Sequence, residues 1–316
     1  MKSKTYSITK TALYIRNSLA LLFRYLPGFR GKSHIGTLLG KLLNFYIDGE
    51  DCIVTVKLKD ASLMQLDIRS RTEQWAYWTG YYDYPIISKL CRSLQSEWVV
   101  FDVGANVGFY TIPFGKRLSS LNGKVYAIEP VPSNSERLSN AVKLNHLEST
   151  VLVHSIALGD EEGIMSMWVE ATNNASTGNA GLIRGNVDAN PETDRKIKVQ
   201  IKTLDNFAQE QQIISCNLIK IDIEGAEVMF LKGGINFITK HRPIIYGEFN
   251  TYFMHKFGYS FLDVINILKP LGYEYFKEIK DGNFVKISQP DAEVENVLLV
   301  PNDLPESIAS CLEIKI

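Results

Sequence analysis

The stretch VVFDVGANVGFYT, residues 99–111, decides the fold of this 316-residue chain. An apolar run ends at the acidic Asp102, a glycine turn follows, and a helical pattern begins near Gly108. Gly104 has no Cβ atom, so the chain can bend there and bring its backbone close to a ligand, and Gly108 permits a close approach of helix and strand. The stretch therefore predicts a strand, a ligand-binding turn and a helix, in that order.

Short apolar runs rich in β-branched residues alternate with helical patterns from residue 98 onward. The predicted strands are 98–102, 124–129, 151–155, 218–222, 243–248, 273–277 and 295–300. The predicted helices are 108–119, 133–146, 226–239 and 260–270. This alternation predicts an α/β, Rossmann-like fold with a mostly parallel, seven-stranded sheet and helices on both faces. Ligands bind such sheets beyond the carboxyl ends of the strands, so residues that end strands are the functional candidates.

Residues 1–74 are predicted to form an N-terminal extension, ahead of a Rossmann-like domain that spans residues 75–316. Helical spacing of apolar residues predicts a first helix that ends near Pro27 and a second over 38–46. Two alternating runs within 52–68 predict a β-hairpin.

The polar face of the first helix is basic and includes Lys10, Arg16 and Arg24. Two interpretations of this helix stay open. It is either an arm that packs on the main domain or on the second subunit of a homodimer, or a peripheral contact with an anionic membrane surface.

Residues 171–196 are polar, rich in Asn and Gly, and longer than an ordinary connection within a compact domain. They are expected to form a substrate-contacting loop or lid, with a plain surface excursion as the alternative.

The composition excludes several classes of protein. The net charge is −1, which gives no sign of a nucleic-acid partner. The four cysteines form no CxxC pair, so no structural zinc site is expected. The sequence requires no metal, although its clustered carboxylates leave room for a divalent ion. No cleavable signal peptide and no apolar run of membrane-spanning length is found, and a cytoplasmic location is expected.

The glycine turn differs from that of dinucleotide-binding proteins. Counting from Gly104, glycines occupy positions 1 and 5, whereas the nicotinamide-dinucleotide pattern has them at 1, 3 and 6. Asp102 adds a carboxylate directly before the turn, which suits a cationic ligand better than a diphosphate. S-adenosylmethionine, with its sulfonium and ammonium groups, fits this pattern.

Two further strand ends carry acidic residues. Glu129 follows Asp102 by 27 positions, and its two oxygens can accept hydrogen bonds from the hydroxyls of a ribose. Asp222 and Glu224 end a later strand, and two close carboxylates can raise one pKa and create a general base. The alternative is that Asp222 binds the amino group of the cofactor and Glu224 caps a helix. Glu248 ends another strand and could orient the acceptor or act as the base.

The order of motifs resembles the FkbM-type methyltransferases. The matching elements are DVGANVGFYT, IEP, ALGDEEG, TLDNF, LIKIDIEGAE, LKGG and RPIIYGE, spread over roughly residues 75–250. The resemblance implies a class I methyltransferase fold and S-adenosyl-L-methionine as cofactor. Its implied cofactor-binding residues are Asp102, Gly104, Ala105, Asn106, Gly108, Tyr110, Thr111, Glu129, Pro130, Ser155, Ala157 and Leu158. Asp222, Glu224 and Glu248 are the candidate catalytic residues.

The predicted function is transfer of a methyl group from S-adenosylmethionine, by direct displacement, to a hydroxyl oxygen of a sugar, glycan or other small molecule. The alternatives are an N-methyltransferase acting on a small molecule, an NAD-dependent oxidoreductase, and a non-catalytic binding module with a nucleotide-binding fold.

Overall fold

The computed structural model describes residues 2–26, 35, 38, 52–170, 180–182, 194–287 and 296–314. Those residues form two compact units, one that ends at Tyr84 and one that begins at Pro85. The second helix expected over 38–46 lies outside the described residues, apart from Leu38, which is helical.

The first unit combines a long helix with a hairpin. The elements are α1 (Lys2–Tyr25), β1 (Ile53–Lys57), β2 (Leu63–Asp67) and α3 (Arg71–Thr79). Strands β1 and β2 are antiparallel, with Thr55 opposite Gln65, so the hairpin predicted within 52–68 is confirmed. No helix in the described part of the chain has the length and apolarity that a membrane span needs.

Helix α1 packs through a different face from the one that its sequence suggests. Ala20 and Phe23 are buried, and the ring of Phe23 meets that of Trp78 edge-on at 6.1 Å. Arg16 is fully buried, and its guanidinium lies 5.5 Å from the ring centre of Tyr77. Because arginine has a long apolar stem and its planar head stacks on aromatic rings, this basic side chain lies in the packed face.

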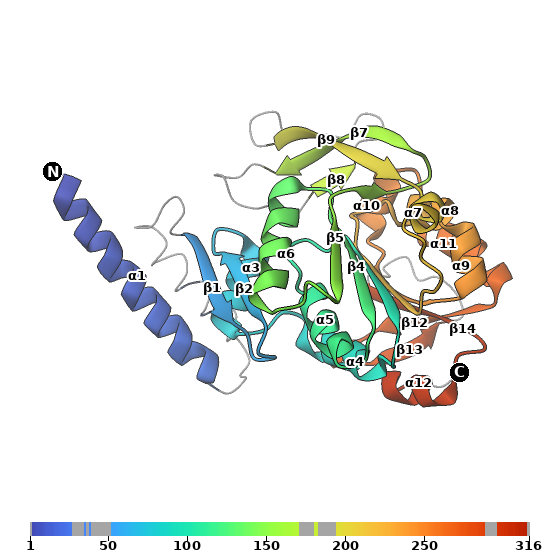
Figure 1. Ribbon diagram of the computed structural model, residues 1–316, viewed down its shortest axis with the longest axis horizontal. Coiled ribbons are helices and arrows are strands. Elements are labelled where there is room, and N and C mark those ends of the chain that lie inside the picture. The colour runs from blue at the N-terminus through green and yellow to red at the C-terminus, as the bar shows by residue number, and fades with distance from the viewer. Residues whose placement is uncertain are drawn as a thin grey trace. The chain divides into compact units, whose positions relative to one another are not determined.

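The second unit is built on an eight-stranded sheet (Figure 1). In sheet order its strands are β13 (Phe284–Ile287), β12 (Tyr273–Glu278), β14 (Asn296–Pro301), β11 (Ile244–Glu248), β10 (Leu218–Ile221), β3 (Val99–Val103), β4 (Lys124–Ile128) and β5 (Val151–His154). The five strands from β11 to β5 are parallel, and the other three pair antiparallel. All seven predicted strands are present and β13 is an addition, which confirms the Rossmann-like α/β prediction.

Helices cover both faces of this sheet, as Figure 1 shows. On one side lie α4 (Tyr84–Ser93), α5 (Thr111–Ser119) and α6 (Pro132–Leu144); on the other lie α7 (Leu204–Glu210), α8 (Glu227–Gly233), α9 (Ile235–His241) and α11 (Phe261–Leu268). The remaining helical elements are α10 (Thr251–Lys256), η3 (Lys269–Leu271), η4 (Lys280–Gly282) and α12 (Glu306–Leu312). Phe101, Phe230 and Val264 belong to the core between the sheet and the second group of helices. Successive strand residues face opposite ways, so Asp102 lies on the α5 side of the sheet.

A four-stranded sheet, which was not predicted, follows β5. Its strands are β6 (Ala157–Leu158), β9 (Asp194–Lys202), β7 (Gly163–Glu170) and β8 (Ala180–Leu182), in that order across the sheet. The prediction that 171–196 is a loop throughout is therefore wrong at β8 and at the start of β9; the remainder lies outside the described residues. The predicted third strand, 151–155, is one residue too long, because β5 stops at His154. The candidates Ala157 and Leu158 belong instead to β6, where Ala157 pairs with Ile201.

One predicted helix, 226–239, is divided into α8 and α9 at Gly233 and Gly234. A Cβ atom on Gly233 would lie 1.9 Å from the carbonyl oxygen of Gly159. The chain at Gly159 can pack this closely only because Gly233 has no side chain. The predicted helix is interrupted at this point.

Candidate functional site

The candidate residues meet at one edge of the main sheet. Strands β4, β3, β10 and β11 are consecutive neighbours, and all four are parallel. Their carboxyl ends carry Glu129, Asp102, Asp222 and Glu248, respectively. The topology thus brings together four acidic side chains that are distant in sequence.

The glycine turn after β3 has three residues in the left-handed region. The φ angles are 78° at Gly104, 50° at Asn106 and 100° at Gly108. A Cβ atom on Gly104 would lie 1.8 Å from the carbonyl oxygen of Asp222, and one on Gly108 would lie 2.6 Å from Leu138. Both glycines are required because the turn is pressed against β10 on one side and α6 on the other.

Four backbone donors of the turn are already paired within the protein. The N–H groups of Gly104 and Ala105 both donate to the carbonyl oxygen of Ile128, each at 3.0 Å. Asn106 donates to Oε2 of Glu129 at 2.8 Å, and Gly108 donates to Ala105 at 2.9 Å. A diphosphate is held by free backbone N–H groups at such a turn, and these four are not free. The turn therefore suits a ligand that does not need anion-binding donors.

Asp102 lies underneath the turn and is fully buried. Its Oδ2 accepts a hydrogen bond from the hydroxyl of Thr111 at 2.5 Å, while its Oδ1 is buried with no hydrogen-bond partner among the described residues. Burial raises the pKa of Asp102, and Lys220 and the Thr111 hydroxyl act against that rise. A bound cation would stabilise the ionised carboxylate further, so the donor set fits a sulfonium or ammonium ligand.

Lys220 is a buried cation within the apolar strand β10. Its Nζ lies 3.3 Å from Oδ2 of Asp222, 3.9 Å from Oδ1 of Asp102 and 5.0 Å from the ring centre of Tyr110. Burial lowers the pKa of Lys220, but the two carboxylates more than offset this, and the net shift is upward. Lys220 therefore stays charged and ties the turn after β3 to the end of β10.

Glu129 is buried at the end of β4. Its Oε2 accepts from Asn106 and its Oε1 accepts from the N–H of Val131 at 2.9 Å. The side chain of Asn134 also hydrogen-bonds to Glu129. A carboxylate has about four acceptor positions, so about one remains for a ligand hydroxyl. Burial raises the pKa of Glu129 to about 7, against the effect of these hydrogen bonds.

The segment after β10 holds a carboxyl group with a raised pKa and a left-handed backbone, that of Glu224. Glu224 has a φ of 54°, a conformation that is strained for a residue with a side chain. Burial, followed by the charges of Asp222 and Glu248, raises the pKa of Glu224 to about 8. Strained backbone and a pKa near neutrality are both typical of a residue that takes part in catalysis.

Glu227 holds this segment in place. It is fully buried in the first turn of α8, and its Oε1 accepts from the N–H groups of Ile223 and Gly225, both at 3.2 Å. Its Oε2 has no hydrogen-bond partner among the described residues, and burial raises its pKa to about 7. The hydrogen bonds show why Glu224, between the two donors, is fixed.

Exposure divides the predicted residues into two groups. Gly104, Asn106, Pro130, Asp222, Glu224 and Glu248 are half-buried, whereas Asp102, Ala105, Gly108, Tyr110, Thr111, Glu129, Ala157 and Leu158 are buried. Ser155 is exposed after β5, and the side chain of Leu158 packs in the main core beside Ile128. Of the predicted cofactor-binding residues, those in the Ser155–Leu158 segment thus have the least evidence for a place beside the glycine turn.

Lys220 and Glu227 are two residues that sequence reasoning passed over. Each left a signal: Lys220 is the only charge within the four-residue strand LIKI, and Glu227 completes a run of closely spaced acidic residues in DIEGAE. Charged residues are almost never fully buried unless they are paired. Within the described ranges, no group of three or more His, Cys, Asp or Glu side chains could hold a metal ion.

Two curated relatives match part of the chain. Hexuronic acid methyltransferase AglP of Haloferax volcanii is 23% identical over 169 residues, which is 54% of this chain and 63% of AglP. Methyltransferase 1 of Beauveria bassiana is 25% identical over 148 residues, which is 42% of this chain and 57% of that protein. The matches thus span less than two thirds of either relative.

Solved structures show a distant likeness. The crystal structure of methyltransferase FkbM from Methylobacillus flagellatus KT has a TM-score of 0.41 at 19% identity, covering 92% of this chain and 58% of that one. The structure of M. jannaschii TYW2 in complex with AdoMet has a TM-score of 0.41 at 16% identity, covering 80% and 86%.

The family assignment rests on the sequence match. The family described as "Methyltransferase FkbM domain" matches residues 102–275, more than half of the chain, from the acidic residue before the glycine turn to β12. The match contains the turn, the end of β4 and the segment after β10, and the sheet has the predicted Rossmann-like order. These findings confirm the predicted resemblance and the class I methyltransferase fold, and the chain belongs to the FkbM methyltransferase family.

Proposed function

We propose that this protein transfers a methyl group from S-adenosyl-L-methionine to a hydroxyl oxygen of a sugar, a glycan or another small molecule. The observation that carries the proposal is the turn after β3. Four of its backbone donors are paired internally, and carboxylates lie around it. Such a site favours a cationic ligand with hydroxyl groups over a nicotinamide dinucleotide.

The residues present fit the cofactor in distinct roles. Glu129 would accept a hydrogen bond from a ribose hydroxyl, next to the half-buried Asn106 and Pro130. Asp222, fixed by Lys220, is the half-buried carboxylate available to the ammonium group. When bound, S-adenosylmethionine supplies an electrophilic methyl group on a sulfonium; the chain supplies alignment and exclusion of water.

Glu224 is the general base in this proposal. Its pKa of about 8 makes it a better proton acceptor than an ordinary carboxylate and still leaves a part of it ionised near neutral pH. The proton of the acceptor hydroxyl would pass to the Glu224 carboxylate as the oxygen attacks. Asp222 and Glu248 would strengthen this base through their negative charges, and Glu248 would also orient the acceptor.

A hexuronic acid methyltransferase among the relatives supports a sugar acceptor. An N-methyltransferase acting on a small molecule is the alternative. An ionised carboxylate base favours a hydroxyl, because a neutral amine can attack before it loses its proton.

Calorimetric titration with S-adenosylmethionine, S-adenosylhomocysteine and NAD tests the cofactor. We expect the first two to bind and NAD not to bind; binding of NAD alone would refute the proposal. A second assay follows transfer of a labelled methyl group to hexuronic acids, neutral sugars and amino sugars. Labelling of the hydroxyl acceptors supports O-methylation, whereas labelling confined to amines supports the alternative.

A further inference from the structure

Helix α1 exposes a continuous apolar face. Between residues 14 and 26, seven large apolar side chains are between 38% and 82% exposed: Tyr14, Ile15, Leu19, Leu21, Leu22, Tyr25 and Leu26. At 100° per residue they fall within less than half of the helix circumference. Exposed apolar side chains scattered singly are normal, but a contiguous group of this kind marks an interaction surface.

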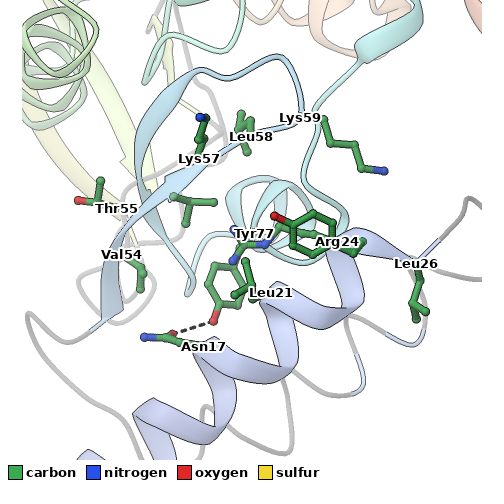
Figure 2. Close-up of a pocket in the computed structure, with 12 residues that line it drawn as sticks. Asn17, Leu21, Arg24, Leu26, Val54, Thr55, Lys57, Leu58, Lys59 and Tyr77 are labelled. Carbon is green, nitrogen blue, oxygen red and sulfur yellow. Dashed lines mark hydrogen bonds between the residues drawn. The ribbon is translucent and has the colours of Figure 1, made fainter.

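This face is not the one that attaches the helix to its own unit. The opposite face carries the buried Arg16, Ala20 and Phe23. There the hydroxyl of Tyr77 donates to Oδ1 of Asn17 at 2.8 Å, as drawn in Figure 2. The helix is therefore held through one side, and its apolar side is left toward solvent in the described part of the chain.

The segment of sequence that contains this helix carries charge of a single sign. Residues 1–47 contain no Asp or Glu, while their basic residues are Lys2, Lys4, Lys10, Arg16, Arg24, Arg30, Lys32 and Lys41. The whole chain has a net charge of −1, so residues 1–47 carry +8 and the remaining residues carry −9. A second copy of the same surface would meet it with repulsion, whereas an anionic surface would be attracted.

A basic pocket adjoins the apolar face. It has a volume of about 790 Å³ and lies between α1 and β1, where Leu21, Arg24, Leu26, Lys57, Lys59 and Tyr77 are among its lining residues (Figure 2). None of the described residues that line it is acidic. The Arg24 guanidinium stacks over Tyr77 at 5.2 Å, and its Nε is buried with no hydrogen-bond partner among the described residues. Burial lowers the pKa of Arg24, which an anionic partner would reverse.

We propose that α1 and this pocket dock the protein on an anionic phospholipid surface. Leu21, Tyr25 and Leu26 belong both to the exposed face and to the pocket lining, so apolar side chains and cations stand side by side. That arrangement matches a lipid, whose acyl region is apolar and whose headgroup phosphate is negative. Tyrosines such as Tyr14 and Tyr25 are favoured at the boundary between the two. The proposal does not depend on methyl transfer.

Flotation of the full chain with vesicles tests the docking. Phosphatidylcholine vesicles and vesicles that also contain phosphatidylglycerol are compared, and we expect binding only to the second. Leu22→Glu and Tyr25→Glu should each weaken binding by at least about tenfold, the effect of losing one buried apolar side chain. Lys57→Glu, at an exposed position, should weaken it by about fivefold or more.

The matched control is Ile214→Glu, which changes an 84% exposed apolar residue in the other unit and should leave binding unchanged. Circular dichroism of each variant verifies its folding. Inorganic phosphate at matched ionic strength should not displace the protein from vesicles, because a free phosphate offers nothing to the apolar face.

Three results would overturn the proposal. One is equal binding to both kinds of vesicle or to neither. Another is a wild-type dimer, seen by sedimentation, that Leu22→Glu dissociates while vesicles bind neither protein; the face would then be covered by a second copy. The last is thermal stabilisation by inorganic phosphate without any vesicle binding, which would make the pocket a site for a soluble anion.

Discussion

The Nζ atom of Lys220 lies 3.3 Å from Oδ2 of Asp222, and Lys220 is the one charged residue of the buried, otherwise apolar strand β10. The same ammonium faces Asp102 on the neighbouring strand, where Lys220 and Asp102 are register partners. One buried cation thus serves two carboxylates that belong to different parts of the site. Its removal would leave both without their nearest counter-charge.

Replacing Lys220 with methionine should lower the free energy of unfolding by about 3–5 kcal/mol at neutral pH, because a buried carboxylate loses its partner. The loss should shrink in acid, where Asp102 can take up a proton. Chemical denaturation at several pH values measures both effects. Lys198→Met, an exposed lysine in β9, is the control and should change stability by no more than about 0.5 kcal/mol. Similar losses in the two variants would contradict the ion-pair role.

Replacing Gly104 with alanine should destabilise the protein by at least about 2 kcal/mol, because the new Cβ atom would strike the Asp222 carbonyl in addition to the unfavourable φ. Gly258→Ala separates the two causes: Gly258 has a φ of 76°, close to the 78° of Gly104, but nothing lies within 4 Å of its Cβ position. The comparison by thermal denaturation should show a clearly larger loss for Gly104. Equal losses would mean that backbone strain alone matters.

Replacing Glu129 with glutamine should weaken S-adenosylmethionine binding roughly tenfold to hundredfold, the value of a hydrogen bond to a charged group. The variant should also lose some stability, because one of the two backbone donors from Asn106 and Val131 would face an amide nitrogen. Calorimetry gives the first quantity and denaturation the second. Glu136→Gln, on the exposed face of α6, is the control for both. An unchanged affinity would rule out the ribose role.

Stability should fall as pH rises from about 5 to about 8. Burial raises the pKa of Glu129 and Glu227 to about 7 and that of Glu224 to about 8, from an ordinary value of 4.5. In this window the folded state binds more protons than the unfolded state, so the free energy of unfolding decreases with pH. Bound S-adenosylmethionine is a cation and should reduce the slope. Denaturation curves across this range check the sign of the slope. A free energy of unfolding that increases with pH would show that the pKa values of these carboxyl groups are not raised.

Replacing Glu224 with glutamine should slow methyl transfer by about 10²–10⁴, the usual contribution of a positioned base. In the wild type, kcat/KM should rise with pH through about 8, as Glu224 loses its proton. This rise of kcat/KM with pH should vanish in the variant, while the affinity for the cofactor changes little. Asp222→Asn is the counterpart. If Asp222 binds the ammonium group, this variant should bind the cofactor more weakly and still show the rise of kcat/KM with pH. If kcat/KM of Glu224→Gln still rises with pH in this range, another residue is the general base.

The sequence determined the main sheet and the edge where the candidate site lies. The parallel strands of the main sheet, β3, β4, β5, β10 and β11, are short runs rich in apolar residues, so their composition and length identify them without any long-range information. The glycine turn was equally visible, because glycines directly after an apolar strand mark a backbone bend; the contacts with Asp222 and Leu138 that exclude a Cβ atom appear only in the tertiary structure. Acidic residues at strand ends follow from the same pattern, since parallel strands deliver their carboxyl ends to one edge.

Only the tertiary structure decided which side of α1 packs, that β6 to β9 form a second sheet, and that Lys220 stands between Asp102 and Asp222. These features depend on pairings between distant segments. Arg16 is a charged residue, yet it is buried where it stacks on Tyr77. Lys220 lies on β10 between β3 and β11, which come from other parts of the chain. The spacing of apolar and polar residues along the sequence indicates which residues prefer the core and which prefer water. It carries no information about the partner that makes burial of a charge favourable, and that partner is supplied by the fold.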